Sequence, residues 1–503
     1  DPATGALTSI KDPAKATIGV TGGTFSTAVD EAYCAEGFIP MENENGTYGV
    51  KQGTYVAAVG SAKYETLSAA IESAAAGETV TLLADAKENV TIAKKLTLDL
   101  NGKTLNGGTE KGKPALTVTA QVTVKDSSEA QTGTIKREDT ADNSGKGSHY
   151  VIDIQDDGWL TFESGSVTNG SGAGGTKGAS LVRVGNDGKA KDPGLTVKGG
   201  TFTQDNFIAI KVDRGTLLME GGTVNSTNSY AIENWWSATL SGGAVNGAVS
   251  SWTYSGGTDS TLKITGGTIN GDVTAVNYDD AEGKKATVEI GGGTVNGKLD
   301  TRRYDPATGA LTSIKDPAKA TIGVTGGTFS TAVDEAYCAE GYAPKKIDDK
   351  TYGVESIVVS IEVSVGDGKK VALPFLKTWL RTNIGETETQ WTAANLEAQA
   401  ANGWAKWVDG VLGLSTTAAQ AGAAVAEQGM AEAIPVSLAH VDADSALLKA
   451  DALKIAYVLS GSNDRTSWTK VSETADKAQL AIPLNNGTLY KYYRVDVEIG
   501  AAE

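Results

Sequence analysis

Cysteine, histidine and aromatic residues are scarce in this sequence of 503 residues. Its 2 cysteines, Cys34 and Cys338, lie in the same seven letters, EAYCAEG. They are therefore one cysteine that has been copied, and neither a disulfide framework nor a thiolate metal site is expected. His149 and His440 are the only histidines, which leaves little imidazole chemistry. We expect no metal and no cofactor.

The chain also lacks a long apolar run and an excess of positive charge. No run of about twenty apolar residues occurs, so no membrane-spanning segment is expected. Against 44 Lys and Arg stand 61 Asp and Glu, and the net charge of −17 argues against nucleic acid as a partner. The 62 glycines, with few aromatics, are typical of a mainly β protein.

What the sequence does contain is an eight-residue phrase that returns seven times. Its first, third and eighth places are apolar or alanine, and a pair of small residues, usually Gly-Gly, stands between them. The copies read LTFESGSV from Leu160, LTVKGGTF from Leu195, LLMEGGTV from Leu217, ATLSGGAV from Ala238, LKITGGTI from Leu262, VEIGGGTV from Val288 and IGVTGGTF from Ile322.

Apolar residues two apart predict a strand with one buried face, and the glycine pair predicts a sharp bend into the next short strand. The phrases begin 21 to 35 residues apart, which is too short for a domain and favours a solenoid of stacked coils. From Val80 to Phe329 we expect about ten coils, which at ~4.8 Å per strand form a rod of roughly 50 Å.

An asparagine follows the eighth place in four successive coils. Equivalent amides one coil apart can pass hydrogen bonds along the rod, so we interpret the row as a structural ladder. The functional alternative is a row that binds a ligand. The four residues are Asn225, Asn246, Asn270 and Asn296.

A much longer repeat encloses these coils. Residues 1–37 are identical to residues 305–341, and TYGV recurs at the same offset of 304 residues. Such identity suggests recent duplication, and we expect this chain to be the C-terminal end of a longer tandem array. The predicted parts are 1–53, the end of a preceding repeat; 54–354, a complete unit; and 355–503, a separate module.

Each end of the complete unit has features of a cap. Residues 65–76 have apolar residues at helical spacing and predict a helix that covers the first coil, whose open strand edges would otherwise promote aggregation. The phrase GGTFSTAVDEAYCAEG predicts a closing segment at the other end. For the last module we expect helices over 370–415 and antiparallel strands over 434–500, in an α+β or sandwich-like fold.

Four parts of the sequence resemble a known family. They are the helical cap phrase YETLSAAIESAAAGETVTLLAD, the following LTLDLNGKTL, the GGT coils and the closing segment. Together they resemble the pectate-lyase-like, right-handed parallel β-helix repeats of very large surface proteins and adhesins from gut and rumen bacteria. The resemblance covers roughly residues 1–354 and implies an extracellular, cell-surface location, but it specifies no ligand. The last module more loosely resembles C-terminal modules of secreted surface proteins, although the calcium-loop spacing of such tails is missing.

Enzymes with this fold cut acidic glycans by means of clustered carboxylates, or of bound calcium with a basic residue. The phrases Gly-His-Gly and Arg-Ile-Lys of polygalacturonases are missing here, and the acidic residues fall in variable turns, where Asp is common. We therefore expect no catalytic residues and no enzyme. The candidates are Asp153, Asp156, Asp157, Asp279, Asp280, Arg302 and Arg303.

Aromatic residues gather in the connections between successive coils. If these connections stack as the strands do, the rings form a lateral patch of the kind on which sugars lie. The alternative, which we favour, is that the rings pack on one another or inward. The residues are Tyr230, Trp235, Trp236, Trp252, Tyr254 and Tyr278.

The sequence thus predicts a non-enzymatic extracellular structural or adhesive protein, a stalk that displays loops on a bacterial surface. One alternative is a subunit of a head-to-tail filament or surface coat, because an open coil can accept another chain. Another is a glycan-binding or polysaccharide-degrading β-helix. The expected partners are host or environmental glycans, surface proteins or identical chains.

Overall fold

The computed structural model describes most of the chain up to residue 364 and shorter stretches beyond it. The described residues are 17–107, 113–137, 150–169, 180–186, 191–204, 207–364, 370–377, 380–381, 384–395, 405–408, 411–415, 433–435, 453–462, 467–476, 479, 481–483 and 492–501. Contacts divide the chain into two compact units, one of Asp1–Glu340 with Pro344–Val354 and one of Gly341–Ala343 with Glu355–Glu503.

The first unit is built on a parallel sheet that we call the first column. Each of its strands pairs with the strand one coil further along the chain, so equivalent residues lie side by side. The strands are β5 (Thr79–Leu82), β7 (Leu96–Asp99), β10 (Gln121–Lys125), β13 (Trp159–Phe162), β16 (Gly194–Val197), β19 (Thr216–Met219), β21 (Ser237–Leu240), β23 (Ser260–Ile264), β26 (Ala286–Ile290) and β30 (Ala320–Val324).

The second column follows the glycine pairs. It starts at β8 and also pairs in parallel from coil to coil. Its strands are β8 (Thr104–Gly107), β11 (Thr134–Arg137), β14 (Ser166–Asn169), β17 (Thr201–Thr203), the first parts of β20 (Thr223–Asn234) and β22 (Ala244–Thr253), β24 (Thr268–Ile269), β27 (Thr294–Val295) and β31 (Thr328–Phe329).

The third column completes each coil before the chain returns to the first. Long β20 and β22 run through both the second and the third column without a break. The strands are β6 (Val90–Ile92), β9 (Leu116–Val118), β12 (Ile152–Ile154), β15 (Val182–Val184), β18 (Ile210–Val212), the ends of β20 and β22, β25 (Val273–Tyr278) and β28 (Leu299–Asp305).

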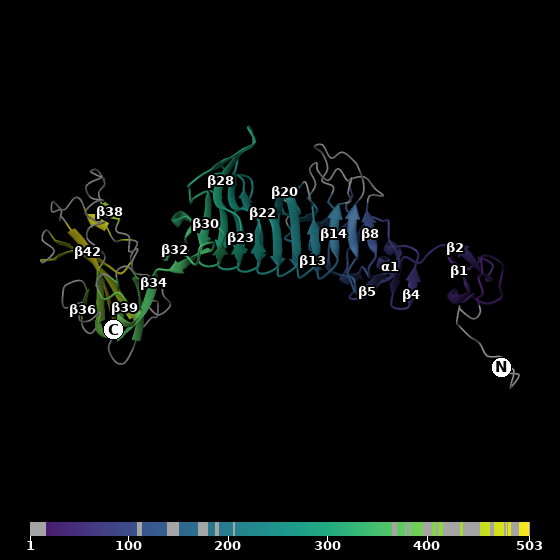
Figure 1. Ribbon diagram of the computed structural model, residues 1–503, viewed down its shortest axis with the longest axis horizontal. Coiled ribbons are helices and arrows are strands. Elements are labelled where there is room, and N and C mark those ends of the chain that lie inside the picture. Colours follow the sequence, from purple (N-terminus) through teal and green to yellow (C-terminus); the bar gives the residue numbers. More distant parts are fainter. Residues whose placement is uncertain are drawn as a thin grey trace. The chain divides into compact units, whose positions relative to one another are not determined.

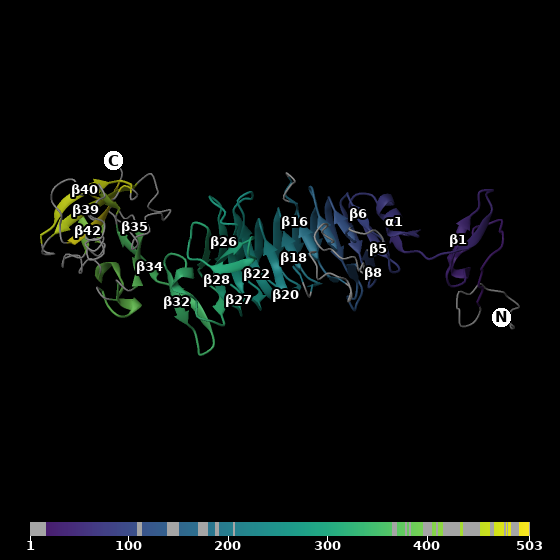
Figure 2. The same ribbon diagram turned by 90° about the horizontal axis from the view of Figure 1, so that it is seen from above.

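The unit is therefore a mainly β fold with long parallel sheets, as a β-helix requires. Figures 1 and 2 show the successive strands side by side through this part of the chain. The apolar places of the repeated phrase form its core: Phe162, Val197 and Phe202, for example, are fully buried in one cluster. The prediction that the first, third and eighth places face inward is confirmed.

Glycine is favoured for a different physical reason at each of the two positions of the pair. A Cβ on the first glycine would meet a carbonyl oxygen of the preceding coil, at 2.1 Å for Gly242 and 2.2 Å for Gly266. The second glycine has the left-handed backbone that L side chains disfavour, with φ of 80° at Gly243 and 79° at Gly267. In these coils the bend therefore leaves no room for a side chain at the first place, and it strongly favours glycine at the second.

A hairpin and a short helix stand at the start of the coils. Strand β3 (Ala57–Val59) pairs antiparallel with both β4 (Ala62–Tyr64) and the edge of β5. Helix α1 (Leu67–Ser73) begins after Thr66, whose hydroxyl accepts a hydrogen bond from the Ala69 N–H. It is shorter than the expected 65–76 and buries Leu67, Ala70 and Ile71 in the same core as the coils.

The closing segment is present in both of its copies. The second copy follows β30 and contributes β31 and the 3₁₀ turn η2 (Glu335–Tyr337). After it comes the hairpin of β32 (Tyr342–Lys346) with β33 (Tyr352–Ser356). The first copy contains η1 (Glu31–Tyr33), β1 (Phe38–Glu42) and β2 (Tyr48–Gln52). A further hairpin, of β28 with β29 (Ala310–Ser313), precedes the second copy.

The second unit corrects part of one prediction. Within the predicted helical stretch 370–415, residues 370–376, 405–408 and 411–415 are strands, whereas residues 377, 380–381 and 393–395 are helical. Residues 378–379, 382–383, 396–404 and 409–410 of this stretch lie outside the described residues. Alternating Val371, Leu373 and Phe375 lie in β35, which pairs along its whole length with β34, and an Asp-Gly sequence separates β36 from its partner β37, as in many hairpins. The strands are β34 (Val358–Ser364), β35 (Lys370–Leu376), β36 (Ala405–Val408) and β37 (Val411–Ser415).

Beyond residue 433 the described pairings are antiparallel, as expected. One sheet has the order β36, β37, β42, β39, β40, and a pair of short strands lies apart from it. The strands are β38 (Ala433–Pro435), β39 (Leu453–Ser462), β40 (Thr469–Thr474), β41 (Ala481–Pro483) and β42 (Tyr492–Ala501), and the short turn η3 (Glu388–Gln390) precedes them.

Candidate functional sites on the coils

The predicted asparagine ladder is present. Each amide nitrogen donates to the amide oxygen one coil earlier, from Asn296 to Asn270, from Asn270 to Asn246 and from Asn246 to Asn225, at 2.7 Å in every case. The Asn225 amide then donates to Thr203 Oγ1 at 3.1 Å. Because each amide is engaged by its neighbours, the row stabilises the coils rather than forming a ligand site.

Five of the six predicted aromatic residues come together at the edge of the third column. With one further tyrosine they form the aromatic cluster, in which ring centroids lie 5.0 to 6.4 Å apart. Its members are Tyr230, Trp235, Trp252, Tyr254, Tyr278 and Tyr304.

The sixth predicted residue, Trp236, is not in the cluster. Its ring lies under the Arg214 guanidinium, 4.7 Å from its centroid, and it packs partly against the core. The two tryptophans lie in the bend between β20 and β21, and their rings leave this bend toward different neighbours.

Tyr304 is the member that the sequence analysis missed. It lies beside Tyr278 in the strand register, and both follow a ladder asparagine by eight residues, as Tyr254 follows Asn246. Counting from the asparagines would have identified it.

The rings of the cluster pack against one another. Trp235 stacks on Trp252 with an interplanar angle of 24°, and Tyr278 stacks on Tyr304 at the same angle. Trp252 is only 5% exposed. The cluster thus has the ring-on-ring packing that we favoured, and this leaves little open ring face for a sugar.

A row of charged residues runs along the outer face of the third column beside the cluster. Asp153, Arg183, Lys211 and Glu233 occupy equivalent positions in successive coils. Arg183 donates two hydrogen bonds to Asp153, at 2.9 and 2.7 Å, and stacks 4.3 Å from the Tyr150 centroid. Burial lowers the pKa of Arg183, but the bonds and charge of Asp153 outweigh it and raise the pKa overall.

Glu233, like Asp153, is a buried carboxylate of this row. It accepts a hydrogen bond from Trp235 Nε1 at 2.7 Å, and burial raises its pKa, opposed by the positive charge of Lys211. Lys211 pairs with Asp213 at 2.9 Å and lies 5.5 Å from the Trp235 ring centroid. Burial and Glu233 together raise the pKa of Tyr230 to about 12. A raised carboxyl pKa is typical of catalytic acids. Here, however, the Glu233 carboxylate already accepts a hydrogen bond from the Trp235 indole.

The candidate catalytic residues are dispersed into local pairs. Asp153 binds Arg183, and Asp157 pairs with Lys191 at 2.8 Å on an exposed turn. Asp156 has a φ of 54°, which identifies it as a turn residue.

The candidates from the later coils are paired locally too. Asp280 pairs with Lys319 and with Arg303, and the Lys319 contact lowers its pKa. Asp279 has a left-handed turn conformation, and Arg302 binds Asp300 at 2.8 Å. These residues do not converge on one site.

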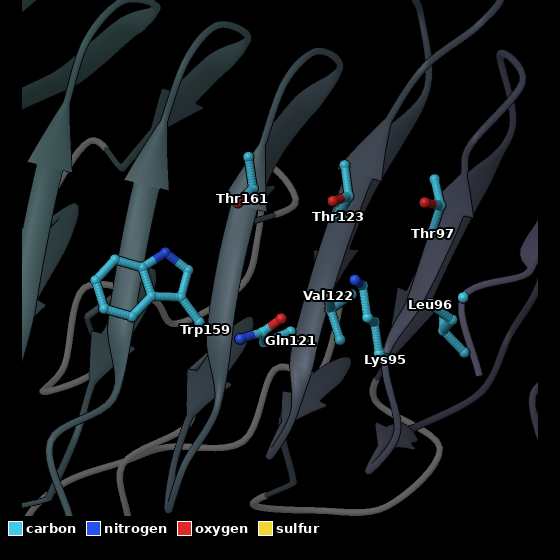
Figure 3. Close-up of a pocket in the computed structure, with 9 residues that line it drawn as sticks. Lys95, Leu96, Thr97, Gln121, Val122, Thr123, Trp159 and Thr161 are labelled. Atoms are coloured by element: carbon cyan, nitrogen blue, oxygen red, sulfur yellow. The ribbon is translucent and has the colours of Figure 1, made fainter.

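A separate surface lies on the outer face of the first column, where the sequence analysis found nothing. Figure 3 shows it as a shallow groove across β7, β10 and β13, which we call the Trp159 groove. Its lining residues come from neighbouring coils: Gly77, Lys95, Leu96, Thr97, Gln121, Val122, Thr123, Trp159 and Thr161.

Other chemistry finds little support in the described chain. Among the described residues, no three His, Cys, Asp or Glu side chains lie close enough to hold a metal ion. Both histidines lie outside the described residues. Burial, with nearby acidic residues, raises the pKa of Cys34 and Cys338, which disfavours their reactive thiolate forms.

The described residues contain no helix with the length and apolar character needed to cross a membrane. Comparisons of the chain with protein-family models, with curated proteins and with solved structures find no match.

Proposed function

We propose that this chain is part of a non-enzymatic, extracellular structural or adhesive protein, in which tandem right-handed β-helices form a stalk on a bacterial surface. The observation that carries this proposal is the closing segment. Its sequence occurs twice, 304 residues apart, and its second copy completes a stack of parallel coils. A closing segment that recurs along a chain is suited to a series of such units, and a series of units builds length.

The hydrogen bonding of the coils supports a mechanical role. The strands of each coil form backbone hydrogen bonds with the coils on both sides. The asparagine ladder adds side-chain hydrogen bonds between four successive coils. The β3–β4 hairpin occupies the edge of β5, and α1 packs on the end of the core. In the proposal these elements are a cap that protects the first coil from unwanted pairing.

In this proposal the last module has an α+β, sandwich-like fold and ends the stalk. Its antiparallel strands support the β part, and the extracellular location rests on the resemblance to surface proteins.

A filament is the second candidate. The coils are joined by strand pairing from one coil to the next, and a strand edge of this kind can also pair with another chain. Head-to-tail assembly would follow from such contacts.

Electron microscopy of the purified protein across a range of concentrations separates the two candidates. The stalk predicts isolated thin rods at every concentration, and the filament predicts regular fibres that lengthen with concentration. Compact particles without a rod would contradict both.

A parallel assay tests the absence of catalysis. We expect no release of unsaturated or reducing sugars from pectin or alginate, with or without calcium, because the candidate carboxylates are dispersed. Calcium-dependent release of unsaturated sugars would contradict the proposal.

A further inference from the structure

The Trp159 ring differs from every ring of the aromatic cluster in what it contacts. A Cβ built on Gly194 would lie 2.4 Å from the Trp159 ring, so one face of the indole lies flat on this glycine of the next coil. Its Nε1 donates to Thr196 Oγ1 at 3.0 Å, which fixes the ring in that plane. Figure 3 shows the indole spread over the sheet, lining the groove.

Beside the ring lie polar groups that the protein does not use. Thr97, Thr123 and Thr161 form one row in strand register, and Lys95 and Gln121 approach from the row that contains Trp159. Within the described residues, none of these five side chains has a hydrogen bond or an ion pair. Lys95 and Gln121 are exposed, and the threonines are partly exposed.

Charged residues along the border of the groove are paired with one another. Lys125 pairs with Asp99 and Lys198 with Glu163, each at 3.7 Å. Threonines also face outward further along the column, as Thr239 does. What distinguishes the groove is the ring that lies flat on the sheet beside the Gln121 amide and the Lys95 ammonium.

We propose that the Trp159 groove binds a glycan chain that lies across the strands. A pyranose has an apolar face that stacks on an indole and hydroxyls that both donate and accept hydrogen bonds. Three strand steps at ~4.8 Å separate Gly194 from Lys95, so the groove spans roughly 14 Å, enough for a short run of sugars. The Lys95 ammonium favours a carboxylate or sulfate substituent at that end.

Other polymers fit the groove less well. The strands are already paired on both sides, so a peptide cannot add to the sheet through its backbone. The net charge of −17 opposes nucleic acid. Glycan binding is independent of the stalk, because a rod without glycan affinity would keep its shape and its coils.

The test is affinity electrophoresis of the full chain in native gels that contain mixed-linkage glucan, xylan, polygalacturonate or mucin. We expect retardation by at least one of these polymers, and Trp159→Ala should weaken it about tenfold or more. Lys95→Ala should weaken it only on the acidic polymers. Two controls should bind as the parent does: Trp235→Ala, from the aromatic cluster, and Thr239→Ala, a threonine of the first column outside the groove.

Three results would overturn the proposal. They are retardation by none of the four polymers, retardation that Trp159→Ala leaves unchanged, and loss with Trp235→Ala instead. Circular dichroism of each variant checks folding. If Trp159→Ala disturbs the fold, Gln121→Ala with Thr123→Ala removes two ligand-facing groups without removing the ring, and the pair should also reduce retardation.

Discussion

Residues 17–37 and 321–341 share one sequence but have different neighbours. Their local structures agree: Asp30 and Asp334 each accept a hydrogen bond from the N–H two residues on, at the start of a 3₁₀ turn. Val20 forms an isolated parallel β-bridge with Cys34, as Val324 does with Cys338. The backbones of Phe25 and Phe329 each pair antiparallel with that of the tyrosine in the following TYGV sequence. Turns and short-range bridges are thus properties of the segment itself.

Burial and strand structure differ between the two copies. In the second copy, the N–H groups of Thr325 and Thr328 donate to Ile290 and Gly293 of the preceding coil, at 2.8 and 2.9 Å. There the segment forms β30 and β31, and Ile322 is buried. Among the described residues no coil precedes the first copy, and Ile18 is exposed. A coil strand is therefore stabilised by the coil before it, as nearest-neighbour coupling in solenoids requires.

The largest expected difference between the copies is in the cost of losing the phenylalanine. Phe329 is 2% exposed in the core, so Phe329→Ala should lower the free energy of unfolding of the last coils by about 3–5 kcal/mol. Phe25→Ala should cost less than about 1 kcal/mol, because Phe25 is partly exposed. Urea unfolding, with far-ultraviolet circular dichroism as the readout, measures both values. Equal losses would mean that the copies are packed alike.

A moderate difference is expected in thiol reactivity. Cys338 packs partly against the core and Cys34 does not, so iodoacetamide should modify Cys34 several-fold faster in the native protein. Trypsin separates the two thiols, because one peptide ends at Lys51 and the other at Lys345. Rates should become equal in urea, which removes the difference in structure. Faster native labelling of Cys338 would contradict the comparison.

The smallest expected effect comes from the ion pair between the first copy and the β3–β4 hairpin. Lys63 of β4 pairs with Glu31 at 2.6 Å, and both side chains are about half exposed. Exposed pairs contribute little, so Lys63→Ala should change the free energy of unfolding by no more than about 1 kcal/mol, and less in 1 M salt. Lys103→Ala, in the first coils, is a suitable control. A loss above about 2 kcal/mol at low salt would show that this contact is a main support of the first copy.

Periodic features of the sequence predicted the fold well. The apolar triplets and the bends recur over seven phrases and the asparagines over four successive coils, so stacking determines where they lie. The groove was missed because Trp159 recurs in no other coil, and the position of its ring depends on Gly194 of the next coil. Trp236 was misplaced because it lies in the bend between β20 and β21, where sequence distance does not determine which neighbour a ring contacts.

The last module was predicted less well for a physical reason. Short apolar stretches such as LPFL fit a helix and a strand equally, and the choice depends on whether a partner strand is present. In β35 that partner is the neighbouring strand β34, whereas β37 also pairs with β42, which is distant in sequence.

The stacking of the coils is the central claim, and a distance between two spin labels tests it most directly. Strand register connects Thr123 of β10 to Glu289 of β26 through Thr161, Thr196, Leu218, Thr239 and Lys263. With Cys34 and Cys338 replaced by serine, labels at Thr123→Cys and Glu289→Cys should be separated by six steps of ~4.8 Å, roughly 29 Å, in a narrow distribution. A broad distribution, or one centred far from this distance, would contradict the stacked coils.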